Sequence, residues 1–180
     1  DIHRWREQIT IPSVSDLDWT VAKVEARDVN RNEHLVQGLV EFGLFERSYL
    51  LIGMEEALMA YVTEPEEMYA LLGALADYKI ELIRAFHDQV ALDMVWYGDD
   101  WGTQTNLFLP VEVWRQIIKP HTKRVYDAIK QLGLLVNQHS CGKIESIFQD
   151  MLEMGVDIWN PCQPCNDLAA LKRQYGGRIT

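Results

Sequence analysis

His139 and Cys141 are the residues whose types and spacing point most directly to chemistry. They follow an apolar run, Leu134-Leu135-Val136-Asn137-Gln138. If that run is a strand, residues i and i+2 project from the same face, so the imidazole and the thiol stand together at its C-terminal end. A neutral imidazole and a thiolate are ligands that zinc prefers. We therefore predict half of a zinc site here, with a buried His and a small hydrophobic Cys as the structural alternative.

A catalytic zinc site needs a third protein ligand, and the next predicted strand offers a candidate. Residues 156–160 read as a strand followed by Pro161-Cys162-Gln163-Pro164-Cys165. Neighbouring strands lie about 5 Å apart, so Cys162 is within geometric reach of the two residues above. Cys162 and Cys165 also have the spacing of a thiol pair, although a single such pair is a weak signal.

Two acidic residues follow another predicted strand, 93–98. Asp99 or Asp100 at the mouth of a barrel would serve as proton donor, proton acceptor or substrate clamp. Adjacent residues rarely point the same way, so we expect at most one of them to act; a solvated loop is the alternative. Gln104, further along this loop, is predicted to bind a substrate or to orient the acid.

Three amide side chains share the predicted strand ends. Asn137 lies on the same face as His139 but deeper, where a polar group needs a partner. Asn160 and Gln163 lie at the neighbouring rim and are weaker candidates of the same kind. We expect these amides to contact a substrate or to support the residues that do.

The elements that must position these residues alternate in type. From residue 93 onward the order is strand, helix, strand, helix, strand, helix, strand, which demands a parallel sheet with right-handed crossovers. No Gly-rich dinucleotide fingerprint follows any strand, so an α/β barrel is favoured over a Rossmann fold. Strands are expected at 93–98, 134–139 and 156–160, and helices at 110–132 (divided at Pro120), 144–152 and 166–175.

The first half of the chain is less regular. Strands are predicted at 20–27 and 44–52, and helices at 30–42, 54–61 and from Thr63 to about His87. We expect an N-terminal connector over residues 1–18. Residues 19–180 are expected to form a partial TIM-barrel domain that lacks its last strands. Because the chain opens with Asp1 and stops where a strand begins, we expect a fragment of a longer protein.

Composition limits the possible partners. The 180 residues are 48% hydrophobic and carry a formal net charge of −10, which argues against nucleic acid as a partner. No run of transmembrane length and no signal peptide are present, so no membrane partner is expected. Three cysteines without a secretory context indicate reduced thiols and a cytoplasmic location.

Three motifs taken together resemble the uroporphyrinogen decarboxylase (URO-D) superfamily. They are Tyr-Gly-Asp-Asp-Trp-Gly-Thr-Gln (97–104), His-Ser-Cys-Gly-Lys (139–143) and Gly-Val-Asp-Ile-Trp-Asn-Pro-Cys-Gln-Pro (155–164). The similarity runs from about Leu39 to the end of the chain, in the same order. It implies an (α/β)8 TIM barrel with its active site in the C-terminal mouth, incomplete in this chain.

The resemblance implies one of two activities. The decarboxylases proper are lyases of porphyrin biosynthesis that use no metal, and Tyr49 with Gly53 resembles their catalytic Tyr-x-x-x-Gly segment. Their N-terminal arginine motif is not visible. The other branch holds methyltransferases that move methyl groups between methoxylated or methylated substrates, corrinoid proteins, and thiols or folate. Its zinc-dependent members use His-x-Cys, matched by His139 and Cys141, and a later Cys that would lie beyond Thr180.

The His-x-Cys signal favours the methyltransferase branch. This interpretation implies zinc, a small-molecule substrate and a corrinoid on a partner protein, with Asp99 or Asp100 protonating the leaving oxygen of a methoxylated substrate. Metal-free decarboxylation, centred on Tyr49 and one aspartate, is the first alternative. A non-catalytic truncated barrel is the second, and its open sheet edges would favour association, including homo-oligomers.

Overall fold

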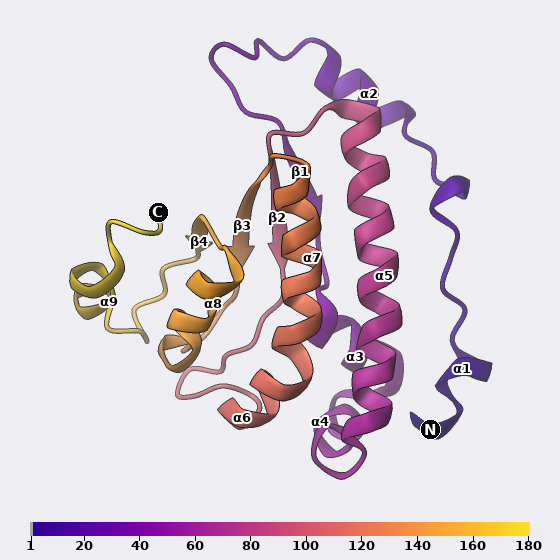
Figure 1. The fold of residues 1–180 in the computed structure, drawn as a ribbon, viewed down its shortest axis with the longest axis vertical. Coiled ribbons are helices and arrows are strands. Elements are labelled where there is room, and N and C mark those ends of the chain that lie inside the picture. Colours follow the sequence, from indigo (N-terminus) through magenta and orange to yellow (C-terminus); the bar gives the residue numbers. More distant parts are fainter. Residues whose placement is uncertain (1) are drawn as a thin grey trace.

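A four-stranded parallel sheet lies at the centre of the computed structural model, which describes residues 2–180. Its strands follow the chain in the order β1 (Gln37–Val40), β2 (Met94–Gly98), β3 (Leu135–His139) and β4 (Ile158–Asn160) (Figure 1). Every neighbouring pair is parallel. This arrangement agrees with the predicted parallel α/β class.

Helices make each crossover between strands. The connection between β1 and β2 contains α3 (Leu44–Ile52), α4 (Met54–Thr63) and α5 (Pro65–Val90). The connection between β2 and β3 contains α6 (Val111–Val113), the π-helical turn η3 (Trp114–Ile118) and α7 (Lys119–Gln131). The connection between β3 and β4 contains η4 (Glu145–Ile147) and α8 (Phe148–Met154). α9 (Leu168–Tyr175) follows β4. The predicted division at Pro120 is confirmed, since a π turn separates α6 from α7 just before that residue.

The segment before β1 consists of short helical pieces and connecting chain. It contains η1 (Ile2–Arg4), α1 (Trp5–Gln8), η2 (Val14–Asp16) and α2 (Thr20–Arg27). The predicted strand at 20–27 is therefore wrong. Asp18 accepts hydrogen bonds from the backbone N–H and the hydroxyl of Thr20, which starts a helix there. Trp19, just before it, contacts Phe86 of α5.

Residues 44–52 form helix α3, so the strand predicted there is also wrong. The buried residues of this helix, Leu44, Phe45 and Ser48, have helical spacing. Because most residues of the segment are apolar, this spacing is not evident from the sequence. The helix predicted at 30–42 is wrong as well, because residues 37–40 pair with β2 as strand β1. In both segments, contacts far along the chain override the local pattern.

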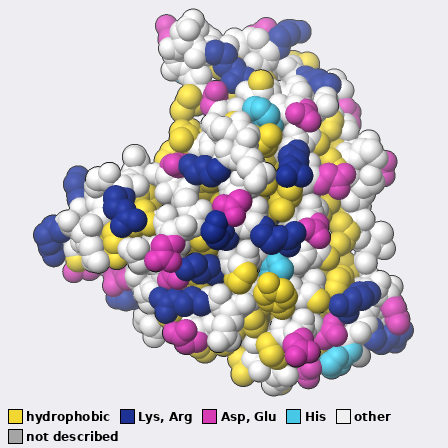
Figure 2. Space-filling model, in the orientation of Figure 1, with side chains coloured by type: hydrophobic (Ala, Val, Ile, Leu, Met, Phe, Trp, Pro, Cys, Tyr) yellow, Lys and Arg dark blue, Asp and Glu magenta, His cyan; other side chains and the backbone are white. Residues whose placement is uncertain are grey.

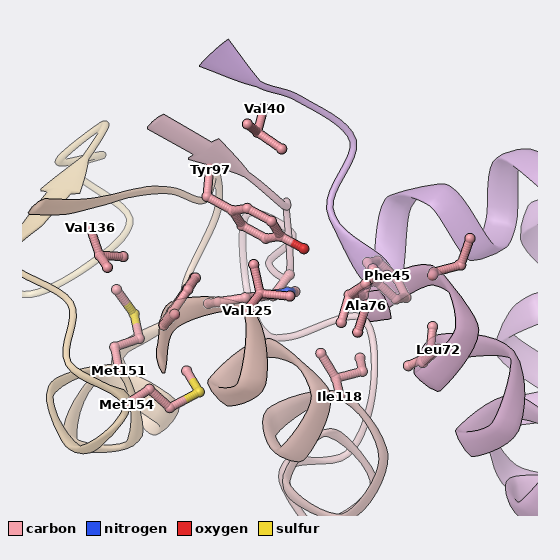
Figure 3. Packing of buried hydrophobic residues seen from close by; sticks show 14 of the residues in the cluster. Val40, Phe45, Leu72, Ala76, Tyr97, Ile118, Val125, Val136, Met151 and Met154 are labelled. Carbon is pink, nitrogen blue, oxygen red and sulfur yellow. The ribbon is translucent and has the colours of Figure 1, made fainter. Parts of the chain in front are cut away.

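The core lies between the sheet and the helices that cover one of its faces. Side chains from alternate positions of the strands, such as Val40, Tyr97 and Val136, point towards the helices (Figure 3). They meet apolar residues of α5, η3, α7 and α8: Leu72, Ala76, Ile118, Val125, Met151 and Met154. On the opposite face, Leu39 and Leu135 remain exposed.

The outer surface of the helices carries charges of both signs (Figure 2). Several of them join neighbouring elements: Asp150 of α8 accepts from Arg115 Nη2 at 3.0 Å and from Lys119 Nζ at 2.6 Å, and Asp77 of α5 pairs with Arg124 of α7. Within residues 2–180, each helix is either too short or too polar to cross a bilayer.

Candidate metal centre

The strands β2, β3 and β4 end at one level. Gly98, His139 and Asn160 are register partners across the three strands, so the residues that follow them leave the sheet side by side. This edge is the carboxyl end of a parallel sheet, where such folds place their sites. The backbone supports the alignment, because Asp99 N donates to His139 O at 3.0 Å and Ser140 N donates to Asn160 O at 2.9 Å.

Three potential ligand atoms converge at this edge. Atoms of Asp100, His139 and Cys141 all lie within 4.8 Å of one another. His139 Nε2 lies 3.5 Å from Cys141 Sγ and 3.5 Å from Asp100 Oδ1. Tetrahedral zinc with bonds of about 2.0 Å to nitrogen or oxygen and about 2.3 Å to sulfur separates neighbouring ligands by roughly 3.3–3.6 Å. Both distances from His139 fall in this range, which suits zinc held by these three side chains.

The orientation of His139 also suits a metal ligand. Its Nδ1 lies 2.7 Å from Asn160 Oδ1, and its ring lies 4.7 Å from the ring of Trp96. An amide oxygen only accepts hydrogen bonds, so Nδ1 carries the proton and Nε2 presents a lone pair. That lone pair faces Cys141 and Asp100.

The groups around Cys141 disfavour its thiolate form, and a cation would offset them. Burial raises the pKa of its thiol to about 11, and the carboxylates of Asp100 and Glu46 contribute to the rise. Asp100 Oδ1 also accepts a hydrogen bond of 2.7 Å from Cys141 N, which keeps its negative charge beside the sulfur. A bound divalent cation would reverse these electrostatics and allow the thiolate to form.

Asp99 and Asp100 point to different places. Asp99 is fully buried and accepts hydrogen bonds from Phe45 N, Glu46 N and Trp101 Nε1 at 2.9–3.1 Å. Burial raises its pKa to about 6 despite these donors. Asp99 thus holds the N-terminus of α3, whereas Asp100 is the member of the pair that reaches His139 and Cys141.

Glu46 is a residue near the site that the sequence analysis did not single out. Its carboxylate accepts a hydrogen bond of 3.2 Å from the Tyr49 hydroxyl. Burial, together with Asp99 and Asp100, raises its pKa to about 7, and burial with Glu46 raises that of Tyr49 to about 12. Glu46 lies in the first turn of α3, which follows β1. A helix prediction for residues 44–52 would have indicated this position, but the sequence analysis predicts a strand there.

The other predicted residues surround the three converging side chains in different ways. Gln163 Oε1 accepts from Gly142 N at 2.7 Å and so holds the turn after Cys141. Asn137 is buried, accepts from Asn160 Nδ2 at 2.6 Å and donates to Gln37 Oε1 at 3.0 Å. Gln104 is exposed on the loop after β2.

Cys162 does not reach the other ligand atoms in this structure. Its side chain is exposed, and its thiol lies 3.7 Å from the carbonyl of Trp159. Among residues 2–180, the third group beside His139 and Cys141 is the Asp100 carboxylate rather than a cysteine. Cys165 lies 3.6 Å from the Asn166 amide, next to the turn that Gln163 holds.

The parallel strands, the helices over one face and a site at the carboxyl edge define a TIM-barrel type of fold, of which this chain contains part. The chain belongs to the family described as Uroporphyrinogen decarboxylase (URO-D), which matches residues 43–180. The superfamily and the incomplete-barrel fold class predicted from the sequence are therefore confirmed.

A solved structure has the same fold. It is a methyltransferase from Methanosarcina mazei, with a TM-score of 0.71 and 16% sequence identity over 87% of this chain. The chain spans only 44% of the length of that protein. No sequence match to a curated protein reaches significance.

Proposed function

We propose that this chain forms part of a zinc-dependent methyltransferase of the URO-D superfamily. The observation that carries the proposal is the convergence of Asp100, His139 and Cys141 at a spacing that suits zinc. The fold shared with a protein named as a methyltransferase supports it. The substrate is a small methylated or methoxylated compound, and a corrinoid protein is the proposed partner in methyl transfer.

His139, Cys141 and Asp100 would hold the metal. When bound, zinc would supply a positive charge that lowers the pKa of a coordinated thiol and so makes it a nucleophile near neutral pH. Asp100 changes role relative to the sequence-based prediction, from a candidate acid to a candidate ligand. Asp99, the other predicted acid, accepts hydrogen bonds from the backbone of α3 and does not reach the three converging side chains.

The Glu46–Tyr49 pair also carries protons near this edge. The Tyr49 hydroxyl donates to Glu46 Oε1, and Glu46 lies close enough to Cys141 to influence its thiol. In a reaction that removes the methyl group of a methoxyl substrate, this pair would donate the proton that the leaving oxygen needs. The bond between the methyl carbon and the oxygen would break as the methyl group passes to the corrinoid of the partner protein, which would in turn transfer it to the acceptor, a thiol or folate.

Metal analysis tests the proposal. We expect the full-length wild-type protein, reconstituted with zinc and desalted, to retain about one zinc per chain, the content of a single three-ligand site. Cys141→Ala should lose it, because a site with two protein ligands holds zinc weakly. Cys162→Ala is the matched control and should retain zinc, because the Cys162 thiol is exposed and lies against the carbonyl of Trp159. A wild-type protein that retains no zinc would overturn the proposal.

Uroporphyrinogen decarboxylation is the second candidate, and one observation favours it. Glu46, Tyr49 and Asp99 form a group of protonatable side chains beside the site, all with a raised pKa. Decarboxylation would use a tyrosine and a carboxylate and leave Cys141 without a role. Turnover of uroporphyrinogen by metal-free protein, retained in Cys141→Ala and lost in Tyr49→Phe, would establish this activity instead.

A further inference from the structure

We propose that Asn160 is a positioning residue that fixes the tautomer of His139, at the end of an amide ladder formed by Gln37, Asn137 and Asn160. The inference rests on the proposed function in one respect: the lone pair that it directs is the one that would bind zinc. The ladder crosses the face of the sheet opposite the helices, from β1 over β2 to β3 and β4.

Each contact of the ladder is short. Asn137 Nδ2 donates to Gln37 Oε1 at 3.0 Å, and Asn160 Nδ2 donates to Asn137 Oδ1 at 2.6 Å. Asn160 Oδ1 then accepts from His139 Nδ1 at 2.7 Å. The three amides therefore point in one direction, with every oxygen facing a donor.

Trp96 reinforces that direction, which the bond from Asn160 Nδ2 to Asn137 Oδ1 also fixes. Its indole Nε1 lies 3.3 Å from Asn160 Oδ1, and an indole N–H can only donate. If the Asn160 amide were reversed, its NH2 group would face the indole N–H, and its oxygen would face the oxygen of Asn137. Two donors and two acceptors would then oppose each other in a partly buried place, at a cost of about 1–3 kcal/mol for each unpaired group.

The consequence reaches His139 directly. With the Asn160 oxygen held towards it, the imidazole is bound as the tautomer with hydrogen on Nδ1. Its Nε2 lone pair then faces Cys141 Sγ and Asp100 Oδ1, both 3.5 Å away. The ring of Trp96, tilted by 39° against the imidazole with centroids 4.7 Å apart, limits rotation of the imidazole. The ligand geometry is thus prepared before any metal binds.

Nuclear magnetic resonance of the metal-free, full-length protein tests the inference. In long-range proton–nitrogen spectra under mildly alkaline conditions, we expect neutral His139 to show a protonated Nδ1 and an unprotonated Nε2. Asn160→Leu removes the acceptor, so Nε2-protonated His139 should appear. Asn160→Asp keeps an acceptor oxygen and should restore the wild-type signature. Trp96→Phe removes the other donor to Asn160 and should leave the His139–Asn160 bond in place.

Zinc affinity gives a second readout. Loss of the group that orients a ligating histidine typically weakens metal binding 10–100-fold, roughly the loss expected for Asn160→Leu, with recovery in Asn160→Asp. A wild-type His139 protonated on Nε2, or an Asn160→Leu variant with unchanged tautomer and affinity, would overturn the inference. If Asn160→Leu does not fold, the wild-type tautomer and the Asn160→Asp spectrum still decide.

Failure of the proposed function would look different. If the wild-type protein binds no zinc but shows His139 protonated on Nδ1, the proposed metal site is refuted and the proposed role of Asn160 is supported. If the protein retains zinc but metal-free His139 is protonated on Nε2, the proposed role of Asn160 is refuted and the metal site is supported.

Discussion

The backbones of Gly102 and Gly142 lie in direct contact. A Cβ atom on Gly142 would lie 2.2 Å from the carbonyl carbon and oxygen of Gly102, and Gly142 has a φ of +83°. Next to this contact, Lys143 N donates to Thr103 O at 2.8 Å. At this point the two loops that carry Asp100 and Cys141 meet backbone to backbone, with no side chain between them.

Substituting Gly142 by Ala should destabilise the protein more than the same change at Gly133. Both glycines have a positive φ, which costs an Ala about 1–2 kcal/mol. Nothing lies within 4 Å of a Cβ on Gly133, whereas one on Gly142 overlaps the backbone of Gly102. We expect Gly142→Ala to lower the free energy of unfolding by about 3 kcal/mol or more in urea titrations. Equal losses at the two positions would contradict the contact.

Substitution of Asp99 should mainly lower stability, whereas substitution of Asp100 should mainly remove metal binding. Asp99→Ala leaves three N–H donors, two of them buried and one partly buried, without an acceptor and should lower the free energy of unfolding by about 3–5 kcal/mol. Asp100→Ala removes one partly exposed hydrogen bond, should cost only about 1 kcal/mol, and should abolish zinc retention. Urea titration and metal analysis of both variants check this. An Asp100→Ala variant that retains zinc would remove the carboxylate from the ligand set.

Lys79 should make stability rise with pH in the alkaline range. Burial lowers its pKa from 10.5 to about 8; Arg47 adds to this effect, while Asp99 and Glu46 oppose it. Its ammonium group donates to Glu41 O at 2.9 Å. Between pH 8 and 10.5 the unfolded chain binds more protons at this residue than the folded chain, so the free energy of unfolding increases with pH through this window.

The variant Lys79→Met checks that pH dependence. The shift corresponds to a rise on the order of 3 kcal/mol, which should be absent from the variant. Because other groups also titrate at alkaline pH, the measured quantity is the difference between wild-type and variant urea midpoints as the pH is raised. Parallel curves for the two proteins would show that Lys79 keeps an ordinary proton affinity.

The second half of the fold could be predicted from the sequence because each of its elements carries its own signal. The apolar spacing from Ile144 to Leu152 predicts the helical segment now seen as η4 and α8, and Gly133 and Gly155 mark two helix ends. The strands β2, β3 and β4 lie within the predicted ranges. Local patterns suffice where a short strand and one helix alternate.

In the first half, α4 and α5 lie where the pattern predicts helices, but β1 and α3 could not be predicted in the same way because their determinants lie far along the chain. The N-terminus of α3 is held by Asp99, 54 residues after Phe45, and β1 is a strand only because β2 pairs with it. The choice of Asp100 over Asp99 as the residue beside His139 follows from that same contact. A sequence shows that two aspartates are adjacent, but not which of them a distant helix will engage.

The common level at which β2, β3 and β4 end has a consequence for how the chain tolerates change. Loss or gain of one residue in the short turn before β4 would move the strand by one position and reverse its faces. After a gain, Trp159, now packed against Phe148 among the helices, would occupy the place beside His139, and after a loss Pro161 would do so; in either case Asn160 would leave it. The spacing between Gly155 and Asn160 is thus as much a part of the site as the side chains that line it.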